Sequence, residues 1–246
     1  MNVESILLTT VRVQTLLGNQ VLTNATGFFF ERDERLFLVT SRHVVRDSFN
    51  HHHPDGLEIE LHVGEERLSM STGFLLPLFD QGMSAWRTCS DAAGDVDIAV
   101  IEVDRDALPD NTVYRAFTPA HLAQHLDWIE VGSPVLVVGF PLGFQDHLHH
   151  LPVVRQATIA SSFGLRFQGK GYFLTDARTH RGTSGAPVVL RLQGPRLASP
   201  DLPWLLLGVH SLRLDVGTRD VVLDEALGLN CAWYADALMT LTSPDG

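Results

Sequence analysis

The sequence has little of what marks a secreted, nucleic-acid-binding or membrane-spanning protein. It contains 2 cysteines in 246 residues, whereas small secreted domains usually carry several paired cysteines. Its 18 Lys and Arg residues stand against 29 Asp and Glu residues, and phosphate binding needs clustered basic residues. No apolar run approaches the roughly 20 residues that a transmembrane helix requires. We therefore expect a cytoplasmic protein that binds neither nucleic acid nor membrane.

Helical periodicity is also scarce. Residues 119–127, with Leu122 and Leu126 four apart, predict one or two turns of helix, and residues 235–241 predict a short helix near the C-terminus. Residues 1–14 contain a short apolar run without the basic segment and small-residue cleavage site of a secretion signal, so we expect a first strand there.

Strand patterns fill most of the chain instead. Short runs rich in β-branched and aromatic residues recur between turn residues, and this is typical of strands. They lie at 6–13, 27–30, 36–40, 57–63, 97–103, 134–140, 153–162, 172–177, 186–192 and 205–211. Many short strands without long helices between them predict an all-β sandwich or barrel. Residues 105–130 lie between two sets of strands and are predicted to be a crossover.

Three short segments carry residues suited to nucleophilic catalysis, in the order His, Asp, Ser. His43 follows a strand in VTSRHVV, Asp97 opens the apolar run DIAVIEV, and Ser184 lies in RGTSGAPVV. A serine hydroxyl is a weak nucleophile at neutral pH and needs an adjacent base. Imidazole can take the proton and return it, while a carboxylate holds the imidazole in the right tautomer. The three residues are therefore predicted to be catalytic.

Neighbouring residues compete for two of these roles. Asp95 lies two residues before Asp97 and on the same strand face, but the Ile-Ala-Val that follows favours Asp97. Thr183 and residues 161–162 compete with Ser184, but Ser184 has a glycine two residues before it and another directly after it. The flexible backbone at such glycines lets amide groups converge on an oxyanion. The amides of Gly182 and Ser184 are the predicted donors.

Together these segments resemble the trypsin-like serine peptidases, and are most similar to bacterial intracellular and HtrA-type members. T-S-R-H-V-V resembles the family's histidine segment, D-I-A-V its aspartate strand and G-T-S-G-A-P its nucleophile loop. T-D-A at 175–177 and G-F-P-L-G at 139–143 resemble segments of bacterial members. An α/β-hydrolase is excluded, because its serine lies on a strand-to-helix elbow and its histidine comes last in the chain.

The resemblance implies an all-β, chymotrypsin-like fold of two six-stranded antiparallel β-barrels with a short C-terminal helix. Residues 1–117 would form the first barrel with His43 and Asp97, and residues 118–246 the second barrel with Ser184. The chain departs from the family at Thr183, where trypsin-like zymogens have the Asp that pairs with a new N-terminus. Activation by that switch is therefore not expected.

The resemblance also implies which residues line the primary specificity pocket. They are Arg178 and Thr179, before the nucleophile loop, and His210 and Ser211, in the strand after it. Ser211 falls where the family has a serine that hydrogen-bonds the catalytic aspartate. A Thr and His pair resembles glutamate-specific bacterial endopeptidases. Because a buried carboxylate needs charge-assisted donors, we expect cleavage after an acidic residue, Glu more than Asp, although the net charge of −11 opposes acidic substrates.

Two hypotheses for the function follow. The first is a serine endopeptidase that acts on protein or peptide substrates without a metal or an organic cofactor. Histidines cluster at 51–53 and 147–150, but consecutive histidines in an extended loop cannot all face one ion, so solvated loops are expected there. The second hypothesis is a latent or non-catalytic trypsin-fold interaction module that needs an activating protein partner.

Overall fold

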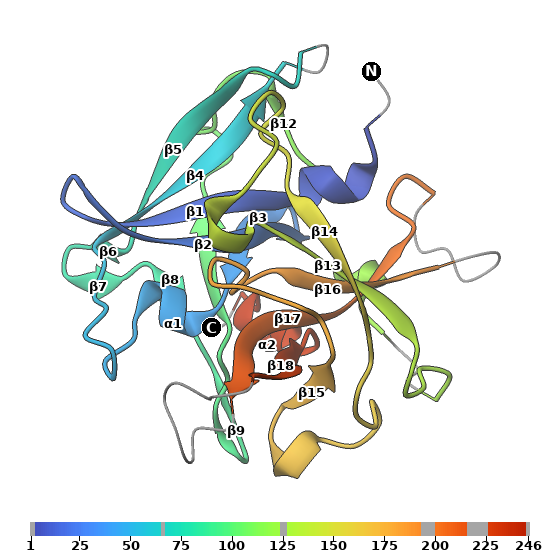
Figure 1. Ribbon diagram of the computed structural model, residues 1–246. Coiled ribbons are helices and arrows are strands. Elements are labelled where there is room, and N and C mark those ends of the chain that lie inside the picture. Colours follow the sequence, from blue (N-terminus) through green and yellow to red (C-terminus); the bar gives the residue numbers. More distant parts are fainter. Residues whose placement is uncertain (1–2, 65–66, 124–126, 193–199, 216–225, 245–246) are drawn as a thin grey trace.

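Two antiparallel sheets, each curled on itself, make up most of the molecule (Figure 1). The computed structural model describes residues 3–64, 67–123, 127–192, 200–215 and 226–244. The strands of the first sheet come from the first half of the chain and those of the second sheet from the second half. The predicted all-β architecture of two barrels is confirmed.

The first sheet contains six long strands and two strands of two residues each. Its long strands are β1 (Thr10–Leu17), β2 (Gln20–Arg32), β3 (Arg35–Thr40), β4 (Gly56–Val63), β5 (Ser71–Pro77) and β11 (Ala99–Val103), and the short ones are β8 (Trp86–Arg87) and β12 (Thr112–Val113). β12, β4, β1, β2, β3, β11 and β8 pair in that order, and β5 also pairs with β4. The amide of Ala85, next to β8, donates to the carbonyl of Leu78, next to β5, at 2.9 Å, so the sheet closes on itself.

The second sheet contains six strands in the order β14, β13, β16, β17, β18, β15. They are β13 (Pro134–Gly139), β14 (Val153–Thr158), β15 (Tyr172–Thr175), β16 (Pro187–Arg191), β17 (Trp204–Asp215) and β18 (Ala226–Tyr234). Ile159, directly after β14, forms an antiparallel bridge with Thr175 at the end of β15. This bridge closes the sheet into a barrel.

The elements outside the two barrels are short. They are the hairpins β6 (Phe79–Asp80) with β7 (Met83–Ser84) and β9 (Ser90–Asp91) with β10 (Gly94–Asp95), the helices α1 (Arg42–Val45) and α2 (Ala237–Leu241), and the 3-10 turns η1 (Ser5–Thr9), η2 (Pro119–His121), η3 (Pro141–Gly143) and η4 (Phe167–Gly169). Among the described residues, no helix has the length and apolar character needed to cross a membrane.

Alternation along β2 and β3 builds two cores at once. Phe29 and Leu38 pack inside the first barrel, whereas Phe28, Phe30 and Phe37 pack between the barrels. Successive strand residues point to opposite faces, so one strand serves both cores. The shared core also contains apolar residues of the second barrel and of α2: Val138, Val189, Leu206, Leu238 and Leu241. The two barrels are therefore joined by a continuous apolar interface.

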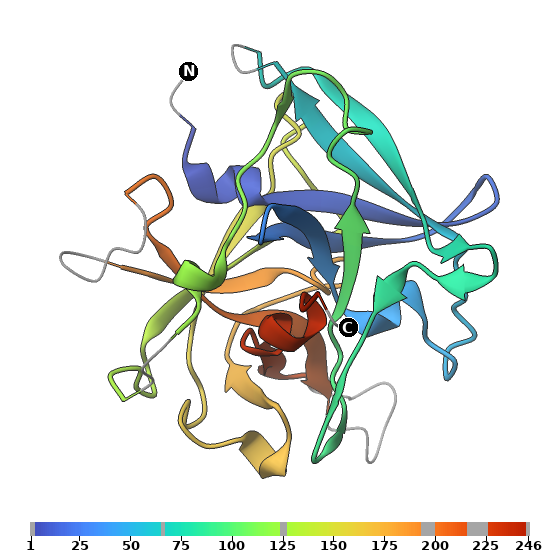
Figure 2. The ribbon, with the colours of Figure 1, turned by 180° about the vertical axis from the view of Figure 1, so that it is seen from behind.

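The helix α2 closes the back of this shared core (Figure 2). The guanidinium of Arg32 donates to the carbonyl of Met239 at 2.6 Å, and that of Arg87 donates to the carbonyl of Ser243 at 2.9 Å. Both arginines belong to the first sheet. The C-terminal segment, which follows the second barrel, is thus fastened to the first, and the predicted C-terminal helix is confirmed.

Several predicted elements have different bounds in the structure. The strand predicted at 6–13 begins only at Thr10, because the Thr9 hydroxyl donates to the carbonyl of Ile6 at 2.7 Å and stabilises η1. The crossover helix predicted at 119–127 is reduced to η2, and residues 124–126 lie outside the described part. β5 was not predicted, since Ser-Thr-Gly at its start breaks the apolar alternation that marks a strand.

Candidate active site

The pairing of β3 with β11 brings His43 and Asp97 together. Thr40, the last residue of β3, pairs with Ala99, the first residue of β11. His43 lies in α1 just beyond β3, and Asp97 lies just before β11, so both residues stand at the same edge of the sheet. His43 Nδ1 is 2.7 Å from Asp97 Oδ2, and the backbone N–H of His43 donates to Asp97 Oδ1 at 2.9 Å.

A third donor completes the environment of Asp97. The Ser211 hydroxyl, from β17 of the second barrel, donates to Asp97 Oδ2. Asp97 is buried, so these contacts fix its orientation toward the His43 ring. The rival Asp95 is exposed and instead contacts Arg42 at 3.0 Å and the Ser90 hydroxyl at 2.9 Å. The structure thus brings Asp97, and not Asp95, to His43.

Ser184 lies in a tight turn that β2 holds from the other barrel. Thr26 donates its amide to the Ser184 carbonyl at 2.9 Å and its hydroxyl to the Gly182 carbonyl at 2.7 Å. Gly185 has φ +87°, and a Cβ there would lie 2.1 Å from the Thr26 carbonyl oxygen. Only glycine fits this contact between the barrels.

The turn leaves two backbone donors unused. Within the described residues, the amides of Gly182 and Ser184 donate to no other group. Gly182 has φ +90°, and the carbonyl of Phe140 and the amide of Leu142 pack against its Cα. Free amides on a rigid turn are the arrangement that stabilises an oxyanion.

The Ser184 hydroxyl has a hydrogen-bond acceptor other than the imidazole. Among the described residues it donates to the Ser211 carbonyl at 3.2 Å and forms no hydrogen bond with His43. Ser211 therefore contacts two of the predicted catalytic residues, Asp97 through its hydroxyl and Ser184 through its carbonyl.

A cavity of about 390 Å³ opens beside Ser184. It is lined by Leu142, Thr179, His180, Arg181, Ser184, His210, Ser211 and Leu212. Three of the predicted pocket residues, Thr179, His210 and Ser211, line it, whereas Arg178 is exposed and lies outside the lining. The arginine that lines the cavity is Arg181, an exposed residue that the sequence did not single out.

His210 is the most buried titratable group at this cavity, with a relative exposure of 2%. Burial, with a smaller effect of nearby His43, lowers the pKa of His210 to about 4. The imidazole is therefore neutral at pH 7. Its Nδ1 is buried without a hydrogen-bond partner among the described residues, and an unpaired buried polar atom is costly.

Asn230 is a second residue that the sequence did not point to. It lies in β18, where the Thr179 hydroxyl donates to its Oδ1 at 2.5 Å and its Nδ2 donates to the Ala177 carbonyl at 2.5 Å. It therefore fixes the wall of the cavity that carries Thr179. A lone buried Asn in the otherwise apolar run ALGLNCAW is a signal that would have found it.

The histidine clusters do not form a metal centre in the described part of the chain, where no three His, Cys, Asp or Glu side chains are grouped to hold an ion. His149 lies 2.6 Å from Asp146, and His150 lies 2.7 Å from Glu60. These two histidines make contacts within the protein, whereas His51 and His53 are exposed, as predicted for a solvated loop.

Comparisons with known proteins agree with the two-barrel fold. The model of the trypsin-like peptidase domain matches residues 25–194. Among solved structures, the serine endoprotease from Yersinia pestis is similar in fold, with a TM-score of 0.52 and 17% sequence identity over 95% of this chain. This chain spans 61% of the length of that protein. No curated protein matches the sequence. Since the domain model covers more than half of the residues, the chain belongs to the family of trypsin-like peptidase domains.

Proposed function

We propose that the protein is a serine endopeptidase that cleaves protein or peptide substrates through an acyl-enzyme. The observation that carries this proposal is the 2.7 Å contact of His43 Nδ1 with Asp97 Oδ2, next to a serine on a turn with free amides. A histidine held through Nδ1 keeps Nε2 available as a base. No metal or organic cofactor is required.

In the proposed reaction, the Ser184 hydroxyl turns from the Ser211 carbonyl toward His43 Nε2. His43 takes the hydroxyl proton while Ser184 Oγ bonds to the scissile carbonyl carbon. The negative charge that develops on the carbonyl oxygen is stabilised by the amides of Gly182 and Ser184. His43 then gives its proton to the leaving amine, and Asp97 stabilises the imidazolium in between. Water hydrolyses the ester by the reverse sequence.

We propose further that the residue before the scissile bond is acidic, Glu more than Asp. Nδ1 of buried His210, which has no hydrogen-bond partner within the described part of the chain, supports this, as does the positive charge of Arg181 at the cavity. A carboxylate beside His210 favours the imidazolium and so strengthens its own binding. Profiling with a peptide library tests the preference, and cleavage mainly after aliphatic or basic residues would refute it.

A latent form of the same module is the second candidate. It is favoured by the Ser184 hydroxyl, which donates to Ser211 rather than to His43. In this alternative a protein partner must reorder the turn 182–184 before catalysis. A fluorophosphonate probe separates the two. Labelling of the wild type but not of Ser184→Ala supports the endopeptidase. Labelling that appears only after lysate of the source organism is added supports the latent module.

The setting proposed for this activity is the reducing cytoplasm. Cys89 and Cys231 are both free thiols, and Cys231 is buried. We also propose that residues 1–117 and 118–246 act as two units, the first supplying His43 and Asp97 and the second Ser184. Expression of the two segments as separate chains, with recovery of probe labelling on mixing, tests this division.

A further inference from the structure

An apolar groove runs from the candidate active site across the second barrel. Its volume is about 490 Å³, within the roughly 300–1,000 Å³ usual for ligand sites. It is lined by Pro141, Leu142, Phe144, Val153, Val154, Arg155 and His180. Leu142 and His180 also line the cavity beside Ser184. The groove therefore lies directly beside the proposed specificity pocket.

The groove displays large apolar side chains to solvent. Leu142 is 69% exposed, Phe144 59% and Val154 40%. Scattered exposed apolar residues are ordinary, but a contiguous group in a hollow marks a binding surface. These three come from two separate segments, η3 with the loop after it and β14, so their grouping is a product of the fold.

The backbone at Leu142 is strained in a way that keeps its side chain at the groove. Leu142 has φ +56°, a left-handed conformation that is costly for a bulky side chain. Its amide donates to the Arg181 carbonyl at 2.6 Å, directly before Gly182. Such strain persists where the surroundings enforce it, and here the nucleophile turn enforces it.

The direction in which a peptide would bind is inferred from Ser211 and Leu212, which line the cavity beside Ser184. β17 and β18 pair up to His210 and again from Arg213, and the register breaks between them. On its other side, β17 pairs with β16 only as far as Val209, although β17 continues to Asp215. Beyond His210 that side of β17 has no strand partner among the described residues, so Ser211 and Leu212 present an edge to which an extended peptide can add. The residues before the scissile bond would pair there. Leu142 lines both the cavity beside Ser184 and the groove, so the residues after the scissile bond have a path past Leu142 into the groove.

We propose that this groove binds the segment of the substrate that follows the scissile bond and selects a bulky apolar side chain there. This inference rests on the proposed peptidase function and adds a second determinant of specificity to it. Burial of a Leu or Phe side chain predicts a gain in kcat/KM of about tenfold to a hundredfold over Ser at the same position. The guanidinium of Arg155 at the groove makes an acidic side chain the competing candidate.

The test uses two sets of substrates with one acyl part. Internally quenched peptides carry Leu, Phe, Ser or Asp at each of the two positions after the scissile bond. A methyl ester with the same acyl part has no side chain there. The ratio of kcat/KM for peptide to that for ester therefore isolates the contribution of the leaving segment. We expect this ratio to be highest for Leu or Phe.

Variants assign the effect to the groove. Phe144→Ser should lower the peptide-to-ester ratio for Leu and Phe substrates about tenfold. Phe49→Ser is the matched control, because Phe49 is 91% exposed and belongs to neither wall. It should leave the ratio as in the wild type.

The outcomes are distinguishable. If the ester is hydrolysed but the peptides show no preference for Leu or Phe, or a preference for Asp, the inference is overturned and the proposed peptidase function remains. A preference for apolar residues only at positions before the scissile bond has the same two consequences. If neither the ester nor any peptide is hydrolysed and the fluorophosphonate probe does not label Ser184, the proposed function fails and this inference fails with it.

Discussion

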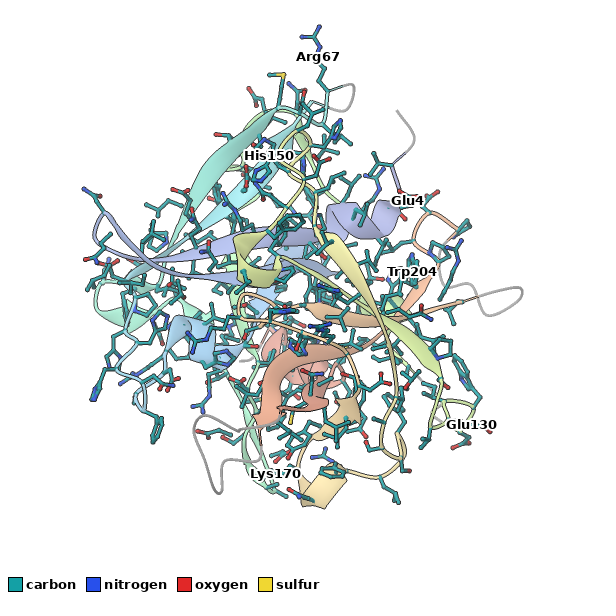
Figure 3. The ribbon with its side chains drawn as sticks, in the orientation of Figure 1. Glu4, Arg67, Glu130, His150, Lys170 and Trp204 are labelled. Atoms are coloured by element: carbon teal, nitrogen blue, oxygen red, sulfur yellow. The ribbon has the colours of Figure 1, made fainter. Side chains whose placement is uncertain are left out.

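His150, labelled in Figure 3, lies with its Nδ1 2.7 Å from Oε1 of Glu60, and this contact joins the two barrels. Glu60 lies in β4 of the first sheet, whereas His150 lies in the loop between η3 and β14 of the second. Gln145, in the same loop, donates to Glu60 Oε2 at 3.3 Å, and Arg12 lies 2.9 Å from that oxygen. The loop between η3 and β14, which begins beside Gly182, is thus held by contacts with the first barrel.

This arrangement predicts that Glu60→Gln destabilises the protein by about 1–3 kcal/mol, because it removes the charge between Arg12 and His150 in a largely buried site. The free energy of unfolding from urea titration measures it. Glu102→Gln is the matched control, since Glu102 is more exposed and pairs with Arg35 within one sheet. Glu102→Gln should lower the free energy of unfolding by less than about 1 kcal/mol. Equal losses in both variants would contradict a special role of Glu60.

Replacement of Asp95 and of Asp97 by Asn should have very different effects on kcat. Asp97→Asn removes the acceptor for His43 and should lower kcat by about 10⁴, because the imidazole then favours the wrong tautomer. Asp95→Asn affects only exposed contacts, with Arg42 and with the Ser90 hydroxyl, and should change kcat less than twofold. Steady-state hydrolysis of one peptide by both variants decides this. A comparable loss in Asp95→Asn would count against the assignment.

Local sequence motifs are enough to single out three residues of the candidate site. His43, Asp97 and Ser184 stand in short segments whose chemistry is readable one at a time, and β3–β11 pairing then places the first two together. Arg181 and Asn230 were missed because their roles depend on which way neighbouring residues face. Thr179 is buried and Arg178 exposed, and of the two arginines only Arg181 lines the cavity, although it is exposed as well.

Contacts between the barrels were beyond sequence reasoning for a different reason. Glu60 and His150 are far apart along the chain, and neither lies in a motif. The pattern of β4 marks Glu60 as an outward-facing strand residue, and nothing local shows that a loop of the other barrel covers it. The same holds for Thr26, whose contacts with Gly182 and Ser184 appear only once the barrels are packed.

The buried His210 predicts that stability falls as the solution becomes acidic. Its folded pKa, about 4, lies below the ordinary value of 6.5 because burial disfavours the charged form. Between these values the unfolded chain binds a proton that the folded chain does not, so stability decreases as pH falls from 6.5 to 4. The loss at pH 4 is on the order of 3 kcal/mol.

Urea titrations at pH 7 and pH 4.5 measure this loss, and His210→Asn should reduce it. Burial also lowers the pKa of His62 and His121, so some loss should persist in the variant. Identical pH dependence in the variant and the wild type would show that His210 does not titrate as described.

Gly18 and Gly185 both have positive φ, and replacing each by Ala separates the cost of backbone strain from the cost of a steric clash. Gly18 has φ +56° with no atom within 4 Å of a Cβ, whereas Gly185 has φ +87° and the Thr26 oxygen 2.1 Å from that position. Gly18→Ala should therefore cost about 1–2 kcal/mol, the left-handed penalty alone. Gly185→Ala must also push β2 away from the nucleophile turn, so it should cost more and abolish labelling of Ser184 by a fluorophosphonate. Both values come from urea titration. If Gly185→Ala were as stable as Gly18→Ala and still labelled, the close contact between Thr26 and the turn would not be what positions Ser184.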